Sequence, residues 1–135
     1  MSVYVTVDLE INDGDCLRVA LEEMGYKVEV HEEAQPLIGF QGDKRKQKAN
    51  VIVRRKHVGS ASNDVGFLKQ DDGTYQMIIS EYDMRGKRQQ EDFTKRLNQI
   101  YAKHKVVKQA KKLGMTITSQ KTTNDNKIKI KVLVP

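Results

Sequence analysis

The most restrictive feature of this sequence is the stretch from Gln89 to Leu113, which contains neither proline nor glycine. Such a stretch predicts one long helix, because no residue in it interrupts helical hydrogen bonding. One helical face is apolar and carries Phe93, Leu97, Ile100, Tyr101, His104 and Val107. Val106 and Ala110 lie on nearly the opposite face. We therefore expect the helix either to break near residues 103–105 or to be covered on two sides.

A strand, a helix and a second strand are predicted before residue 31. The opening "SVYVTVDLE" alternates Val3, Val5, Val7 and Leu9 with polar neighbours, which predicts a half-buried strand. Asn12 or Asp13 can cap a helix, and Gly25 ends it. The segment "YKVEVHEE" then alternates again and predicts the second strand.

The middle of the chain predicts a loop, a strand and a hairpin. Pro36, Gly39 and Gly42 indicate a loop. The following "ANVIVRRK" has apolar residues on both faces and is expected to be a central strand. Asp72-Gly73 lies between two apolar runs, and this pair favours a tight β-hairpin turn because it accepts positive φ.

After the long helix, Gly114 provides a stop, and "MTITSQK" and "KIKIKVLVP" predict a second hairpin around "TTNDN". The predicted order is therefore βαβ, β, β-hairpin, long helix, β-hairpin. This order indicates an α+β fold with a largely antiparallel sheet that two helices cover on one face. The first crossover is left open to a parallel pairing.

Length and composition bound the class of protein. A chain of 135 residues predicts a single domain, residues 1–135. Hydrophobic residues make up 38% and charged residues 31%, and no apolar run reaches the ~20 residues of a membrane span. The N-terminus lacks a signal-peptide pattern, and the single Cys16 cannot form an internal disulfide. We expect no membrane partner and a cytoplasmic location.

Charge is distributed unevenly along the chain. Residues 1–33 carry a net charge of −7 and residues 34–135 a net charge of +13, for a total of +6. A polyanionic partner is one interpretation of the basic part, because clustered lysines and arginines release counterions from phosphates. The alternatives are that the acidic segment folds against the basic one, or that molecules associate head to tail.

Three basic clusters are candidate binding surfaces. The first comprises Lys44, Arg45, Lys46, Lys48, Arg54 and Arg55, and extends to Lys56. The second comprises Lys127, Lys129 and Lys131, which alternate with apolar residues and would form a ridge with steps of roughly 6.5 Å. The third lies on the long helix, at Lys103, Lys105, Lys108, Lys111 and Lys112. Lysines on edge strands also serve to prevent sheet extension.

The stretch from Gly39 to Lys56 raises the question of a phosphate-binding loop. It lacks the Walker pattern, and its Gly-x-x-Gly resembles the loop of KH domains only weakly, because its flanks predict strands. We expect "GDKRKQK" to be a mobile, solvated loop whose cations point apart, because long cations lose rotamer freedom when they are held together. The strand "NVIVRRK" is expected to be protected.

No catalytic residue, metal ligand or cofactor is predicted. Cys16 in a helical first turn and His104 on the long helix are interpreted as structural residues. The histidines and Cys16 share no metal-binding spacing. Asp13 and Asp72 are explained by a helix cap and a turn.

Several short segments resemble one family by their order and spacing. They are Gly39-Phe40-Gln41-Gly42, Ile52-Val53-Arg54, Asp64-Val65-Gly66-Phe67, Asp72-Gly73-Thr74-Tyr75, Gln99-Ile100-Tyr101-Ala102 and Ala110 to Gly114. The chain resembles the hypothetical chloroplast open reading frame 35 family, also called domain of unknown function 1257, over nearly its whole length. The resemblance implies no activity. It implies a cytosolic compartment, a plastid stroma, or the host cytoplasm for a phage protein.

The chain departs from that family in two places. It has no Trp, whereas relatives carry one near Glu81 to Asp83, and Gly59 to Asn63 resembles an insertion. The residues favour a small basic, non-enzymatic binding module that contacts RNA or DNA phosphates nonspecifically, since few aromatics are available for base stacking. The alternatives are a protein-protein adaptor or assembly subunit, including self-association, and an enzyme.

Overall fold

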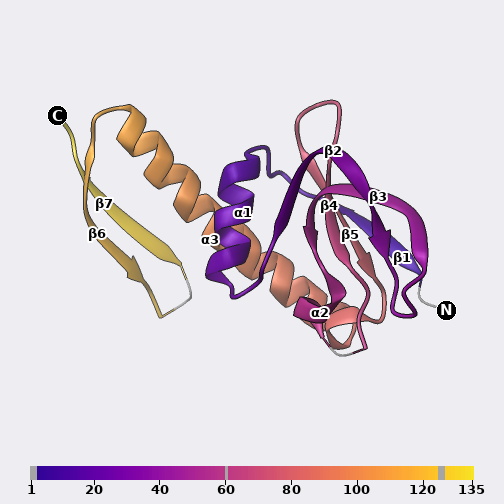
Figure 1. Ribbon diagram of the computed structural model, residues 1–135. Helices are drawn as coiled ribbons and strands as arrows, with labels where there is room; N and C mark the ends of the chain where they lie inside the picture. The colour runs from indigo at the N-terminus through magenta and orange to yellow at the C-terminus, as the bar shows by residue number, and fades with distance from the viewer. Residues whose placement is uncertain (1–2, 60, 125–126) are drawn as a thin grey trace.

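The computed structural model describes residues 3–59, 61–124 and 127–135 (Figure 1). Its strands are β1 (Tyr4–Asp8), β2 (Glu29–Ile38), β3 (Lys44–Val53), β4 (Val65–Lys69), β5 (Tyr75–Ser80), β6 (Thr116–Thr122) and β7 (Ile128–Leu133). Its helices are α1 (Gly14–Glu23), α2 (Arg55–Val58) and α3 (Lys87–Lys112), with a 3₁₀ turn at Asp83–Arg85. The α+β class is confirmed. Neither α2 nor the 3₁₀ turn was predicted from the sequence.

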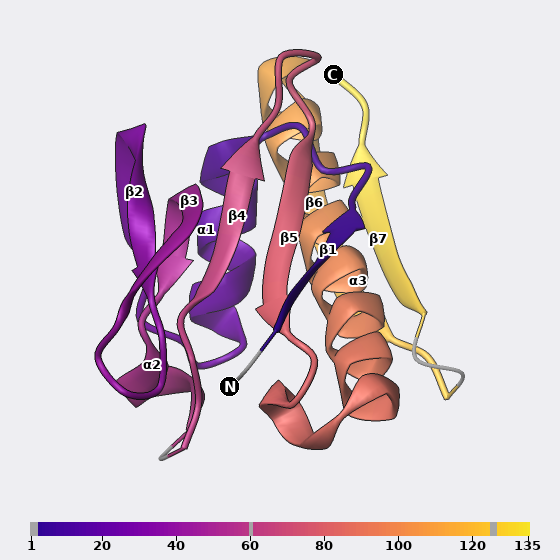
Figure 2. The same ribbon diagram turned by 90° about the vertical axis from the view of Figure 1, so that its right-hand side faces the viewer.

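Two antiparallel sheets form. The larger has the strand order β1-β5-β4-β3-β2, and the smaller pairs β6 with β7 (Figures 1 and 2). Strands β1 and β2 lie at opposite edges of the larger sheet, so the first crossover joins two strands that do not pair. Strand β2 instead forms a hairpin with β3.

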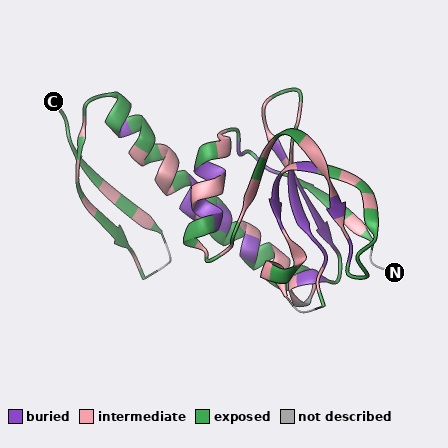
Figure 3. Ribbon diagram, viewed as in Figure 1, coloured by how far each residue is buried: buried purple, intermediate pink, exposed green. Residues whose placement is uncertain are grey.

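The main core lies between α1, α3 and one face of the five-stranded sheet. Val51, Val53, Phe67, Met77 and Ile79 point from the sheet into this core. The helices contribute Leu17, Ala20, Leu21, Phe93, Leu97, Ile100 and Tyr101. Figure 3 shows the buried residues concentrated in the central strands and in the facing sides of the helices. The prediction that two helices cover one face of the sheet is confirmed.

The opposite face of the sheet is covered by the outer half of the β2–β3 hairpin. Leu37 and Ala49 from this half pack on Ile52 and Ile78. The hairpin bends at a bulge, where four residues of β2 lie opposite Asn50 of β3. The Asn50 amide donates to the His31 and Glu32 carbonyls at 3.3 and 3.1 Å, and its oxygen accepts from the Lys69 amide at 2.9 Å.

Two expectations for the hairpin were wrong. Pro36 lies inside β2, and the segment that starts at Lys44 is strand β3 rather than a loop. Proline is tolerated there because β2 is an edge strand. The turn is also tied down from a distance: the Phe40 amide donates to Asn63 Oδ1 at 2.9 Å, and the Ile38 amide donates to Asp64 Oδ2 at 2.8 Å.

Strand β1 is more exposed than its alternation predicts. Val3, Val5 and Val7 are 55%, 36% and 37% exposed, and only Leu9, just after the strand, is buried. The register with β5 is regular, so the residues are correctly assigned to a strand. They remain exposed because β1 is the edge strand, where a groove of about 840 Å³ separates it from α3.

Helix α3 is continuous over 26 residues and is covered on two sides. One side of α3 contacts α1 and the five-stranded sheet, and the other side contacts the β6–β7 hairpin (Figure 1). The second sequence alternative is therefore confirmed, and the break near residues 103–105 is absent. The predicted stop at Gly114 has the positive φ of 74° that glycine adopts readily.

Candidate nucleic-acid interface

The acidic N-terminal part folds against the third basic cluster. Lys103 Nζ lies 2.6 and 2.7 Å from the two Glu23 oxygens, and His104 Nε2 lies 3.1 Å from Glu23 Oε1. Lys108 donates to Asp13 Oδ2 at 2.6 Å. These pairs join the ends of α1 to α3, so part of the helix charge is used within the fold.

Asp13 shows the electrostatic effect of this pairing. Partial burial raises the pKa of its carboxyl, but hydrogen bonds from Lys108 and from the Cys16 amide outweigh burial and lower the pKa to about 2. The same carboxyl caps α1, which confirms the predicted cap. The Asp13 carboxylate therefore caps α1 and forms the ion pair with Lys108 at the same time.

Arg54 is held in the interior of the first basic cluster. Its guanidinium donates to both Glu29 oxygens at 2.8 and 2.9 Å and to Asp64 Oδ2 at 2.7 Å. The hydrogen bonds from Arg54 lower the pKa of Glu29 to about 2 and, against desolvation, Glu29 raises the pKa of Arg54. Two carboxylates surround this cation, so its charge is used within the fold.

The other cations of β3 differ in exposure: Arg45 is half-buried, whereas the three lysines are exposed. Arg45 lies over the Tyr4 ring, 4.9 Å from its centroid, and 3.5 Å from an Asp43 oxygen. Lys44, Lys46 and Lys48 are exposed and form no ion pair with any other residue that the structure describes. They occupy alternate positions of a strand rather than of the expected loop.

The second cluster lies on the outer face of the β6–β7 hairpin. Ile128 and Ile130 face α3, where they line a hollow with Val106 and Lys127. Lys129 and Lys131 alternate with the isoleucines, and all three lysines are exposed. Lys129 stands directly opposite Lys121 of β6, and Lys131 stands opposite Ser119. We call Lys121, Lys129 and Lys131 the hairpin lysine face.

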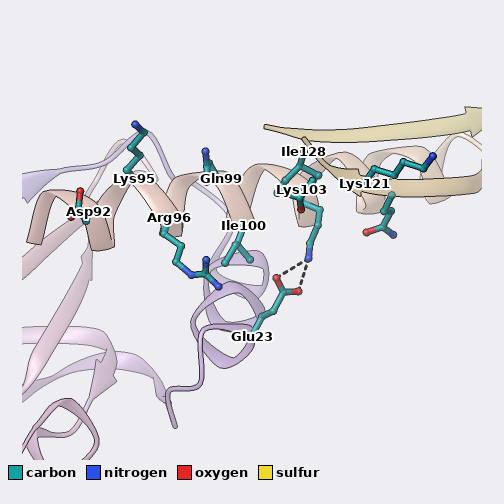
Figure 4. A pocket seen from close by; sticks show the side chains of 11 residues that line it. Glu23, Asp92, Lys95, Arg96, Gln99, Ile100, Lys103, Lys121 and Ile128 are labelled. Carbon is teal, nitrogen blue, oxygen red and sulfur yellow. Dashed lines mark hydrogen bonds and ion pairs between the residues drawn. The ribbon is translucent and has the colours of Figure 1, made fainter. Parts of the chain in front are cut away.

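A polar cavity of about 580 Å³ adjoins this face (Figure 4). It lies between α3, the end of α1 and the hairpin, and Lys95, Arg96, Lys103 and Lys121 line it together with Glu23 and Asp92. Figure 4 shows Lys103 pointing to Glu23, while Lys95 points away from it. Four cations against two carboxylates leave the lining with a net positive charge.

The predicted clusters do not form one surface. The turn of the β2–β3 hairpin and the β6–β7 hairpin lie at opposite ends of the molecule (Figure 1). Lys121, Lys95 and Arg96 were not predicted from the sequence as binding residues. Lys121 is the last residue of the predicted strand "MTITSQK", but counting outward from the middle of the predicted turn places it opposite Lys127, whereas the structure pairs it with Lys129.

The candidate chemical groups do not meet. Cys16 is buried at the start of α1, and burial together with the nearby Asp13 charge raises the pKa of its thiol. His104 contacts Glu23, at the other end of the same helix. Among residues 3–59, 61–124 and 127–135, no group of three His, Cys, Asp or Glu side chains is arranged to hold a metal ion.

The fold and this surface define a small α+β protein with a basic hairpin at one end. Residues 20–131 match the family described as protein of unknown function DUF1257, and the chain belongs to that family. The chloroplast open reading frame name is not part of this match and stays a prediction. No curated protein and no solved structure matches the chain. None of the described helices is long and apolar enough to cross a membrane.

Proposed function

We propose that the protein is a single-domain, non-enzymatic binding module that contacts RNA or DNA phosphates nonspecifically through the hairpin lysine face. The observation that carries the proposal is the direct opposition of Lys121 and Lys129 on a solvent-facing surface. Like charges directly across two strands destabilise a hairpin. A phosphate backbone that neutralises the two lysines removes their repulsion, and this relief contributes favourably to the free energy of binding.

The surroundings support this use of the hairpin. Lys121, Lys129 and Lys131 form no ion pair with any other described residue, unlike Lys103 and Lys108 of α3. The adjoining cavity adds Lys95 and Arg96, which are likewise without an ion pair in the part of the chain that the structure describes. Phosphate contacts by lysine carry no sequence information, so binding would be nonspecific.

A salt series with single- and double-stranded oligonucleotides tests the proposal. The logarithm of the affinity should fall with the logarithm of salt concentration by ~0.9 per duplex phosphate contact and ~0.7 per single-strand contact. Changing Lys121, Lys129 and Lys131 together to Thr should weaken binding at low salt at least about tenfold and reduce the slope by roughly two to three.

The matched control changes Lys46, Lys48 and Lys69 to Thr. It removes the same charge from exposed residues of the five-stranded sheet and should retain most of the affinity. Equal losses in both triple variants would show that net charge, rather than the hairpin, attracts the nucleic acid. Binding that does not respond to salt would also refute the proposal.

A protein adaptor or assembly subunit, including self-association, is the second candidate. It is favoured by the exposed valines of the edge strand β1 and by Tyr82, which lines the groove beside them and is 69% exposed. Edge strands without lysine, proline or a bulge pair readily with other chains. Light scattering after size exclusion and an affinity pull-down test it, and a monomer without partners would count against it.

An enzyme is the least favoured function, because Cys16 lies in the first turn of α1 whereas His104 contacts Glu23 at the other end of that helix. For the proposed binding module we also propose a cytoplasmic or stromal location.

A further inference from the structure

The two ends of β3 meet around one cavity. Lys44, the first residue of β3, and Arg54, Arg55 and Lys56, which directly follow its last residue Val53, all line a cavity of about 660 Å³. A straight strand of ten residues would separate its ends by roughly 30 Å. They meet here because the bulge at Asn50 folds the outer half of the hairpin back over the sheet.

The floor of this cavity is a fixed hydrogen-bonded network. Asp64 is 1% exposed and accepts from the Ile38 amide at 2.8 Å, the Arg55 amide at 2.7 Å and Arg54 Nη1 at 2.7 Å. Arg54 is held from its other side by Glu29. The network therefore fixes the backbone at Ile38 and at Arg55, which are the two sides of the cavity.

The charge that remains around the cavity is positive. Arg54 offsets one of its two carboxylate partners, Glu29 and Asp64. Lys44, Arg55 and Lys56 add three positive charges and form no ion pair with any other described residue. The sum over these six side chains is +2. Cations gathered around one hollow repel one another and raise the local concentration of anions.

We propose that this cavity binds the phosphate group of a small phosphorylated molecule. Arg55 provides a planar fork of donors that matches phosphate geometry, and Lys44 and Lys56 provide point charges. Pro36 and Ile38 give the cavity an apolar wall for the remainder of the ligand. A volume of this size is typical of small-molecule sites. The site differs from the hairpin lysine face in position and in shape, being a hollow rather than an open ridge.

Titration with pyrophosphate and with adenosine monophosphate, followed by NMR of backbone amides, tests the proposal. Both probes should bind saturably and shift the amide signals of Lys44 and of Arg55 to Val58. The double variant Arg55→Gln, Lys56→Gln should bind pyrophosphate at least about tenfold more weakly. Its fold should persist, because the contact of Arg55 with Asp64 is made by the backbone amide.

The matched control is Lys46→Gln, Lys48→Gln, which removes two exposed lysines of β3 that do not line the cavity. It should bind pyrophosphate as the unchanged protein does. Equal weakening in both double variants, or shifts that never saturate, would overturn the proposal. The variant without the hairpin lysine face should retain pyrophosphate binding, so the two proposed sites can fail separately.

A competition arm identifies the source of the phosphate. A 5′-phosphorylated oligonucleotide that displaces pyrophosphate, when its unphosphorylated twin does not, would assign the site to a nucleic-acid end. Displacement by adenosine monophosphate but by neither oligonucleotide would assign it to a free small molecule. Displacement by both oligonucleotides alike would overturn the site, because internal backbone phosphates would then suffice.

Discussion

At the scale of single residues, the structure depends on a few side chains that join distant segments. Asp64 links the β2–β3 turn to the start of α2, and Asn63 links the same turn to Asp83. Asp83 is buried, and burial raises the pKa of its carboxyl. Gly66 has no room for a side chain, because the outer half of the β2–β3 hairpin packs on the sheet at this residue.

Gly66→Ala should destabilise the protein by about 1–3 kcal/mol, the range of overpacked cores. A Cβ at this position would lie 2.6 Å from the Ala49 Cβ and 2.9 Å from Leu37 Cδ2. Urea denaturation measures the loss in the free energy of unfolding. The double variant Gly66→Ala, Ala49→Gly removes the nearest contact and should recover part of it; no recovery would place the cause elsewhere.

Glu29 should make stability depend on pH in the acid range. Its folded pKa of about 2 lies below the ordinary 4.5, so the stabilisation is present above about pH 4.5 and is lost as the pH falls towards 2. Glu29→Gln should flatten this part of the stability profile. Thermal unfolding from pH 6 to pH 2 measures it, and an unchanged profile in the variant would refute the assignment.

At the scale of elements, the β6–β7 hairpin combines a cost in stability with a basic surface. Lys121 and Lys129 face each other, and the hairpin contacts the remaining structure mainly through α3. Its apolar residues cover the second side of that helix. The hairpin thus serves the fold with one face and presents lysines with the other.

Lys129→Glu should stabilise the hairpin and weaken nucleic-acid binding at the same time. It replaces a like-charged pair by an opposite one, a change of about 0.2–1 kcal/mol. Lys131→Glu is the control, because its partner is Ser119 and its gain in stability should be smaller. Thermal unfolding and oligonucleotide titration measure the two effects. A loss of stability in Lys129→Glu would contradict the proposed repulsion.

At the scale of the whole molecule, burial is concentrated in the five-stranded sheet and its two helices (Figure 3). The smaller sheet is mostly exposed or half-buried and its described residues include none that is fully buried. Stability against local opening follows the density of buried contacts. The two sheets should therefore differ in their protection.

Hydrogen exchange followed by mass spectrometry should show the slowest exchange in β3, β4 and β5 and faster exchange in β6 and β7. Strand residues near Lys44 should also be protected, because they pair with β2 and the turn is tied to Asn63 and Asp64. Rapid exchange throughout residues 44–48 would instead support the mobile loop expected from the sequence.

The sequence by itself determined most elements and the class of the fold. Alternation identified the strands, Asp72-Gly73 and Gly114 marked a turn and a helix end, and the absence of proline and glycine marked α3. These signals are local, since each depends on a few neighbouring residues. They also identified the exposed lysines of β3 and β7.

Only the tertiary structure decided which charges remain available. Arg54, Lys103 and Lys108 are bound to carboxylates far away in the sequence, whereas Lys129 faces Lys121 and Lys44 lies beside Arg55. The bulge at Asn50 and the edge position of β1 likewise depend on strands that the local pattern does not contain. A side chain's charge is set by its type, but its partners are set by long-range packing, which a local pattern cannot specify.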